Sequence, residues 1–162
     1  MANANVLWIF FPIAITLHNL EEAIWMPRWS LHAKRFRKPV EPREFHFGII
    51  VVTMLAYLSC FLALTYPSLL LFKHIFFGFL GAMILNAFIP HLVATIVFRR
   101  YSPGLLTGLL LLVPINSVLV VKAIVSGDLQ WFDFFSSTAV VAVLLLALLP
   151  FLFRLGKRLI DY

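Results

Sequence analysis

Residues 5–26 read NVLWIFFPIAITLHNLEEAIWM, and the rest of the chain is best understood from this stretch. The run is about as long as an α-helix must be to cross the hydrocarbon core of a bilayer. It contains His18, Glu21 and Glu22, which share one helix face because they lie three and four residues apart. Ionisable groups at membrane depth are costly unless they are paired, hydrated or metal-bound. This cluster is therefore a candidate functional site.

The composition indicates a polytopic membrane protein that is all-α. Of the 162 residues, 62% are hydrophobic and only 12% are charged, whereas about a quarter of the residues in soluble domains are charged. No polar stretch is long enough to fold separately, so residues 1–162 are expected to form a single helical membrane domain. The basic residues follow the edges of the apolar runs, which makes nucleic acid a poor candidate partner. The one cysteine, Cys60, excludes an intramolecular disulfide.

Five apolar runs are long enough to cross a membrane. The first is expected to end at Pro27 and the second at Pro67, because proline cannot continue a helix without losing a hydrogen bond. The predicted spans are residues 5–26, 45–66, 68–98, 104–126 and 131–153.

Most of the basic residues lie in three places: the connector 28–44, the Arg99–Arg100 pair and the C-terminal tail. The positive-inside rule places these on the cytoplasmic side. We therefore expect a multi-pass plasma-membrane protein with its N-terminus outside and its C-terminus in the cytoplasm. An odd number of spans agrees, because it places the two termini on opposite sides. For the connector 28–44, two interpretations stay open. It is an interfacial segment lying on anionic headgroups, or a charged loop that only fixes the topology.

Polar residues of the first and third spans fall at similar depths. At 1.5 Å per residue, Glu22 and Glu21 lie roughly 9–11 Å inside the cytoplasmic edge of the first span, and His18 lies roughly 15 Å inside. His91 lies roughly 12 Å inside the third span and Asn86 roughly 20 Å. The two sets are therefore expected in the same leaflet.

Pro90 is expected to kink the third span between Asn86 and His91, because proline removes the hydrogen bond to the carbonyl four residues back. Irregular backbone at membrane depth is tolerated where it lines a cavity or is buried in protein. The alternative is an ordinary kink that neighbouring helices absorb. In the fourth span, Thr107 lies roughly 6 Å from the same membrane edge.

Two histidines and two glutamates form a possible ligand set for zinc or another divalent metal, with a carboxylate left as general base. We expect His18, Glu22 and His91 to be metal ligands or proton carriers, Glu21 to be a catalytic base, and Asn86 to orient or hold an oxyanion. The spacing matches no chain-local zinc signature. Without a metal, a His–Glu pair supports acid–base chemistry. The structural alternative is a polar network that locks the first and third spans together.

Three motifs resemble those of the HXXEE-domain family, which comprises small, mostly bacterial integral membrane proteins. They are residues 18–22 (HNLEE), residues 86–91 and residues 99–104 (RRYSPG). Their order and spacing extend the resemblance over nearly the whole chain. The resemblance implies a polytopic helical protein without an established reaction. Its implied candidate site consists of His18, Glu21, Glu22, Asn86 and His91.

Three classes of function remain. The favoured one is a membrane enzyme whose site opens toward the cytoplasmic leaflet and acts on a lipid-like or amphipathic substrate, by metal-assisted hydrolysis or acid–base isomerisation. It predicts a bound metal or a lipid-sized pocket that reaches the site. The second is a proton-coupled transporter, since intramembrane Glu and His mark proton paths, although no inverted repeat is visible. The third is a non-catalytic membrane subunit or lipid-binding protein whose polar residues join the helices.

Overall fold

The structure, a computed structural model, describes residues 4–32, 34 and 39–160, and these residues contain helices but no strand. The predicted all-α class is confirmed. The first half comprises a short 3-10 helix and three α-helices: η1 (Ala4–Ile9), α1 (Phe10–Ser30), α2 (Pro42–Thr65) and α3 (Leu70–Asn86). The second half comprises η2 (Ala87–Leu92), α4 (Val93–Phe98), α5 (Leu105–Thr107), η3 (Gly108–Leu112), α6 (Val113–Val125) and α7 (Trp131–Ile160).

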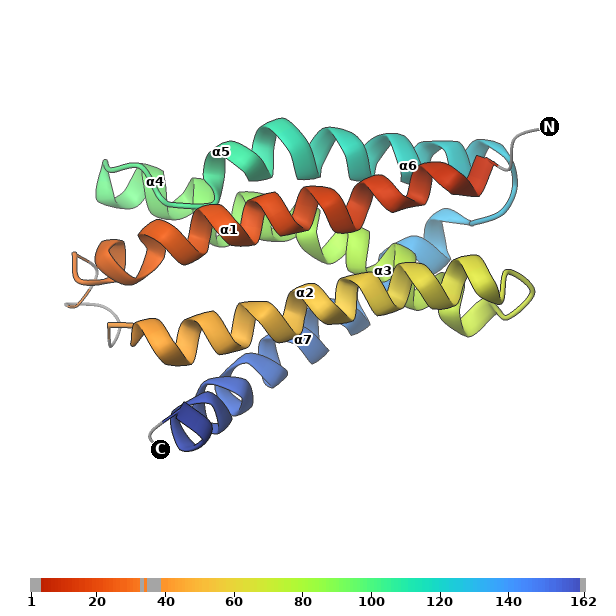
Figure 1. Ribbon diagram of the computed structural model, residues 1–162. Helices are drawn as coiled ribbons and strands as arrows, with labels where there is room; N and C mark the ends of the chain where they lie inside the picture. Colours follow the sequence, from red (N-terminus) through yellow and green to blue (C-terminus); the bar gives the residue numbers. More distant parts are fainter. Residues whose placement is uncertain (1–3, 33, 35–38, 161–162) are drawn as a thin grey trace.

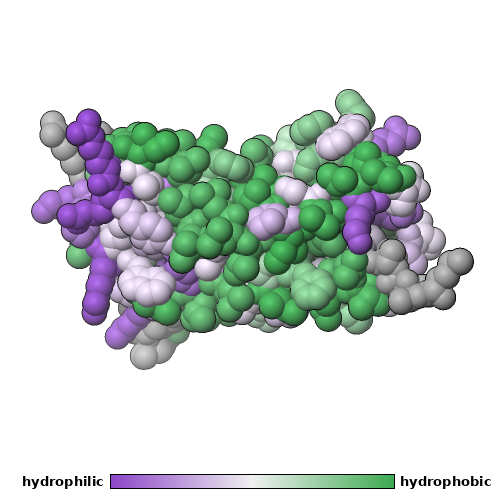
Figure 2. Space-filling view, turned by 90° about the horizontal axis from the view of Figure 1, so that it is seen from above, coloured by the Kyte–Doolittle hydropathy of each residue, from purple (hydrophilic) through white to green (hydrophobic). Residues whose placement is uncertain are grey.

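Within the described part of the chain, five helical stretches are long and apolar enough to cross a membrane. They are Val6–Ser30, Pro42–Thr65, Leu70–Phe98, Leu105–Val125 and Trp131–Leu159. The predicted number and order of spans are confirmed. Figure 1 shows these helices running along one bundle, with α1 beginning at one end and α7 finishing at the other. The face seen in Figure 2 has a hydrophobic band between two ends where hydrophilic side chains gather. The orientation in a membrane stays a prediction.

The first span continues past its expected end. Helix α1 includes Pro27 and ends at Ser30, so the prediction that Pro27 ends the helix is wrong. A proline leaves the carbonyl four residues earlier without its helical donor, and here that carbonyl belongs to Ala23. His46 Nε2, from α2, donates to the Ala23 oxygen at 2.9 Å. A neighbouring helix therefore supplies the hydrogen bond that the proline removes.

The connector between the first two spans is shorter than predicted, because α1 extends to Ser30 and α2 begins at Pro42. Proline is favourable in the first turn of a helix, where its missing N–H has no helical partner to lose. Residues 33 and 35–38 lie outside the described residues, and with them much of the predicted interfacial segment.

The third span is broken where Pro90 predicted a kink. The regular helix α3 ends at Asn86 and passes into the π-helical segment η2, in which Ile89 has the non-helical angles φ −129° and ψ 108°. Helical geometry resumes in α4. The predicted kink between Asn86 and His91 is confirmed, and both Ile89 and Pro90 line the cavity described below.

Aromatic packing joins η1 and the start of α1 to α3. The Trp8 ring stacks on Phe76 with ring centroids 4.9 Å apart, and Phe77 lies edge-on to Trp8. Phe11, Phe76 and Phe77 are completely buried. These rings hold η1 and the beginning of α1 against α3, which carries Asn86 and leads into η2 with His91.

Helix α3 packs closely against α7 at two glycines. A Cβ atom on Gly78 would lie 2.6 Å from the Ser137 carbonyl oxygen, and one on Gly81 would lie 2.0 Å from Thr138 Oγ1. Small residues let helix backbones approach in membrane proteins, where packing replaces the hydrophobic effect as the force between helices. The two glycines thereby fix the position of α7, which forms one wall of the cavity.

Candidate functional site

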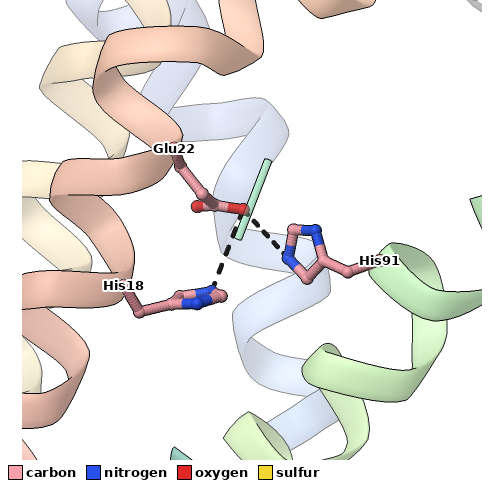
Figure 3. A group of neighbouring side chains, drawn as sticks. All are labelled: His18, Glu22 and His91. Carbon is pink, nitrogen blue, oxygen red and sulfur yellow. Dashed lines mark ion pairs between the residues drawn. The ribbon is translucent and has the colours of Figure 1, made fainter. Parts of the chain in front are cut away.

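Three ionisable side chains from two separate helical elements meet inside the bundle. His18 and Glu22 extend from α1 and His91 extends from η2, as Figure 3 shows. Glu22 Oε1 lies 3.0 Å from His91 Nε2 and 4.0 Å from His18 Nε2. The two imidazole rings meet edge to face, with centroids 5.2 Å apart. The depth argument from the sequence therefore identified residues that are true neighbours.

The three side chains differ in their access to solvent or ligand. The side chains of His18 and His91 are 0% and 1% exposed, whereas that of Glu22 is 12% exposed. Buried charges are expensive unless they are paired. Glu22 is thus the most exposed member of the cluster, and both it and His91 line the cavity described below.

Asn86, the last residue of α3, bridges the two histidines. Its Nδ2 atom lies 3.2 Å from His18 Nε2 and 3.1 Å from His91 Nε2. An amide group offers two N–H donors on its nitrogen and two lone pairs on its oxygen. The same side chain can therefore donate to two unprotonated ring nitrogens or, turned over, accept from a protonated one.

Glu21 faces the beginning of the fourth span. Its Oε1 atom accepts hydrogen bonds from the Gly104 N–H at 2.8 Å and from the Tyr101 hydroxyl. Its Oε2 atom accepts hydrogen bonds from the Thr107 N–H at 3.0 Å and from Thr107 Oγ1 at 2.6 Å. The first N–H groups of a helix have no helical partner, and a carboxylate is favourable beside them. Glu21 of α1 therefore caps the helix that begins at Leu105.

Tyr101, in the connector after α4, completes this cap. Its hydroxyl accepts a hydrogen bond from the Leu106 N–H at 3.1 Å and donates one to Glu21. The residue is 47% exposed, but its hydroxyl end points inward to the carboxylate. Burial raises the pKa of Tyr101 to about 12, and the hydrogen bond to Glu21 acts in the same direction. The phenol consequently stays protonated at neutral pH and remains a donor.

Thr107 connects the cap to the histidine cluster. Its Oγ1 atom, which donates to Glu21, also lies 3.2 Å from His18 Nδ1. The two nitrogens of the His18 ring thus face different groups. Nδ1 faces Thr107, while Nε2 faces Asn86 and Glu22.

The backbone of Gly104 closes against both imidazole rings. Gly104 has φ +91°, in the region that side-chain-bearing residues rarely adopt. A Cβ atom at this position would lie 2.7 Å from His91 Cε1 and 2.9 Å from His18 Cε1. Glycine is required both by the backbone angle and by the contact with the rings.

A cavity of about 370 Å³ opens beside the cluster, a size typical of small-molecule sites. Glu22, Asn86 and His91 line one part of it, together with Asn19, whose Nδ2 donates to Thr53 Oγ1 at 2.7 Å. The remaining lining is mostly apolar and comes from α1, α2, α3, η2 and α7, with residues such as Met26, Phe45, Val52, Leu145, Leu149 and Phe153. The cavity is thus apolar with a polar end.

All five candidate residues predicted from the sequence lie in this region, but they form two groups. One group consists of residues that face one another: His18, Glu22, His91 and Asn86. Glu21 forms the other group and is connected to His18 through the Thr107 hydroxyl, which contacts both residues. Sequence reasoning gave no role to Tyr101, Gly104 or Thr107. The RRYSPG motif and the shallow depth of Thr107 were the available indications.

Comparison with known proteins agrees with these motifs. Residues 8–119 match the family described as "Protein of unknown function with HXXEE motif". The chain belongs to the HXXEE family. In this chain the histidine and the last glutamate of the motif are His18 and Glu22, which face His91. The glutamate before Glu22 is Glu21, which caps the fourth span.

A relative of this HXXEE protein, "Uncharacterized protein YrkK" of Bacillus subtilis (strain 168), is 52% identical over 149 residues. The alignment covers 92% of this chain and 94% of that protein. No solved structure matches the chain. The family match includes the HXXEE helix, the broken third span and the RRYSPG connector, but it ends within α6. Helix α7, which forms part of the cavity wall, lies beyond it.

Proposed function

We propose that this HXXEE protein is an intramembrane enzyme that acts on the polar end of an amphipathic, lipid-like molecule. The observation that carries the proposal is the cavity, which is apolar along most of its lining and has Glu22, Asn86 and His91 at one end. An apolar pocket that reaches the polar residues supports the enzyme hypothesis. The site opens toward the cytoplasmic leaflet of the plasma membrane in this proposal, following the depth and charge arguments.

The substrate's apolar part lies between α2 and α7, against side chains such as Phe45, Val52 and Leu149. A molecule that already resides in the bilayer gains little from moving its tail into an equally apolar pocket, for the same reason that helices in lipid gain little from apolar contact. Selectivity therefore resides at the polar end, where Glu22 and Asn86 meet the reacting group.

A divalent cation such as zinc would be held by His18 Nε2, a Glu22 oxygen and His91 Nε2. Ligand atoms of these three residues lie within 4.8 Å of one another. Three lone-pair atoms meeting in an enclosed space repel one another unless a proton or a cation lies among them. Three protein ligands with one open position are typical of catalytic zinc sites. When bound, such an ion polarises a substrate oxygen and lowers the pKa of a bound water.

The reaction class that suits these groups is hydrolysis of an ester-like bond. The water oxygen bonds to the carbonyl carbon, the bond to the leaving oxygen breaks, and one water proton passes to the leaving alcohol. Asn86 is placed to orient the carbonyl oxygen, where negative charge develops. Glu21 accepts four hydrogen bonds already. We therefore assign proton transfer to the Glu22 oxygen that would not bind the metal, and not to Glu21.

Elemental analysis of the full-length protein after mild detergent extraction tests the metal. About one divalent ion per chain is expected for the unaltered protein, with clear losses in His18→Gln and His91→Gln. His74→Gln is the matched control, because His74 lies elsewhere, near Asp133. Absence of metal in the unaltered protein, or equal metal content in all variants, rejects the metal centre.

Reconstitution tests the activity. Protein in liposomes made from native lipid extract is incubated, and the lipids are compared by mass spectrometry between the unaltered protein and Glu22→Gln. A lipid-derived product that depends on Glu22 supports the enzyme, and identical lipid profiles reject it.

A second candidate, metal-free acid–base isomerisation, is favoured by the direct 3.0 Å contact between Glu22 and His91. Such a pair can pass a proton between two positions of a substrate. It predicts a product of unchanged mass, formed by protein that contains no metal. A product whose mass increases by that of water rejects it.

A further inference from the structure

The hydroxyl group of Thr107 has a single hydrogen to donate. Its Oγ1 atom lies 2.6 Å from Glu21 Oε2, and the carboxylate accepts hydrogen bonds at both oxygens. A carboxylate surrounded by donors offers no hydrogen of its own. The Thr107 hydrogen is therefore directed to Glu21, and the lone pairs of Oγ1 are left for another donor.

His18 supplies that donor. Its Nδ1 atom lies 3.2 Å from Thr107 Oγ1, and only an N–H at this position makes a favourable contact with an oxygen whose own hydrogen is already used. A neutral imidazole carries one N–H and one unprotonated nitrogen. With the proton on Nδ1, Nε2 has a free lone pair. Because His18 is completely buried, solvent does not compete for either nitrogen.

We propose that Glu21 and Thr107 are positioning residues that fix the tautomer of His18, so that its Nε2 lone pair points toward Asn86 and Glu22. This is the role of the outer groups around metal-binding histidines, which accept the second ring N–H and thereby set both the tautomer and the ring orientation. The arrangement serves a metal ligand and a general base equally well. The inference therefore does not depend on the proposed reaction.

The two histidines are not equivalent. Among the described residues, His91 Nδ1 is buried and has no hydrogen-bond partner. His91 Nε2 lies 3.0 Å from Glu22 Oε1, an acceptor, and 3.1 Å from Asn86 Nδ2, a donor. These neighbours therefore do not fix the tautomer of His91. His18, by contrast, already presents an unprotonated nitrogen, and the chain from Glu21 through Thr107 maintains it.

NMR of full-length protein labelled with ¹⁵N-histidine, in lipid nanodiscs and without added metal, tests this directly. Correlations between ring nitrogens and ring carbon-bound protons identify which nitrogen is protonated. The His18 signals are assigned by their loss in His18→Gln. The expected result is protonated Nδ1 and unprotonated Nε2 at His18. Protonated Nε2 at His18 in the unaltered protein overturns the proposal.

Substitutions at Thr107 test whether its hydroxyl group sets the tautomer of His18. Thr107→Val keeps the shape and removes the oxygen, so the Nε2-protonated form of His18 is expected to become the larger population. Thr107→Ser keeps the hydroxyl and should restore the Nδ1-protonated form. Thr16→Val is the matched control, because the Thr16 hydroxyl bonds to Pro12 O and Tyr57. An unchanged His18 tautomer in folded Thr107→Val overturns the proposal.

The proposal stays falsifiable if Thr107→Val does not fold. The unaltered protein and Thr107→Ser then decide it, because both must show the Nδ1-protonated form. Failure of the metal or lipid experiments leaves these tautomer signals unaffected, so the two proposals can fail separately.

Discussion

Glu21 and Glu22 are adjacent in sequence, yet their carboxylates interact with different parts of the molecule. Both Glu21 oxygens accept hydrogen bonds from the beginning of the fourth span and from Tyr101. Glu22 Oε1 lies 3.0 Å from His91 Nε2 at the polar end of the cavity. Successive residues of an α-helix point about 100° apart around its axis, since 3.6 residues make one turn. The two adjacent carboxylates of one motif therefore have different surroundings: Glu21 caps a helix, and Glu22 faces the cavity.

The two glutamates should respond differently to the same substitution. Glu21→Gln places an amide NH2 group against N–H and O–H donors, and each buried donor left without an acceptor costs about 1–3 kcal/mol. Glu22→Gln keeps an oxygen for His91 and should cost much less. Thermal unfolding can be followed through the reaction of a dye with Cys60, the one cysteine, which is buried. If Glu21→Gln unfolds no earlier than Glu22→Gln, Glu21 is not the cap.

Gly104→Ala should be more harmful than the same change at Gly127. Both glycines have positive φ, +91° and +78°, so alanine strains the backbone similarly at both, by about 1–2 kcal/mol. Only at Gly104 does the added methyl group approach the His91 and His18 rings, whereas at Gly127 it meets nothing within 4 Å. The dye assay should show a lower unfolding temperature for Gly104→Ala. Equal losses would mean that the ring contacts are unimportant.

Much of the fold follows from local sequence. Five apolar runs predict five spans because helix length and bilayer thickness are both fixed, and the break near Pro90 follows from its missing N–H. Pro27 has the same chemistry, but its effect was misjudged. The donor that compensates for it, His46, belongs to the next helix, and nothing near Pro27 in the sequence reveals it.

The sequence predicted how deep in the membrane the candidate residues lie, but not the direction in which each side chain points around its helix. Counting residues from the membrane edge brought His18, Glu22 and His91 to one level, because rise per residue is constant in a helix. It did not tell which neighbour Glu21 faces, since the rotation of each helix depends on packing across the bundle. Thr107 was therefore noted only as a polar residue at a similar depth, and its contact with His18 required the three-dimensional structure.

Gly81→Ala should loosen the packing of α3 against α7, and a second change should relieve it. The new Cβ would lie 2.0 Å from Thr138 Oγ1, and overpacking of this kind costs about 1–3 kcal/mol. Thr138 Oγ1 has no hydrogen-bond partner among the described residues, so Thr138→Ala removes the nearest atoms without breaking a hydrogen bond, and only the Thr138 Cβ atom, at 2.9 Å, stays close to the added carbon. The double variant should unfold at a higher temperature than Gly81→Ala alone. Strictly additive losses would contradict the close contact.

Alkaline pH should weaken the cap through Tyr101. Its pKa is raised from 10.0 to about 12 in the folded protein, so the folded state retains a proton that the unfolded chain loses first. The contribution of the Tyr101 proton to the free energy of unfolding is therefore complete below about pH 10 and disappears as the pH rises toward about 12. Tyr101→Phe removes the hydroxyl and should be less stable than the unaltered protein at neutral pH, with the difference shrinking over that alkaline range.

Unfolding temperatures from tryptophan fluorescence, measured at neutral pH and at several alkaline values, check this dependence. Tyr66→Phe is the control, because Tyr66 follows α2 and its ring packs against Phe72. A difference between Tyr101→Phe and the unaltered protein that stays constant through the alkaline range would contradict the prediction. In that case the phenol proton would not be what joins Tyr101 to Glu21, and the cap would depend on the backbone donors and on Thr107 alone.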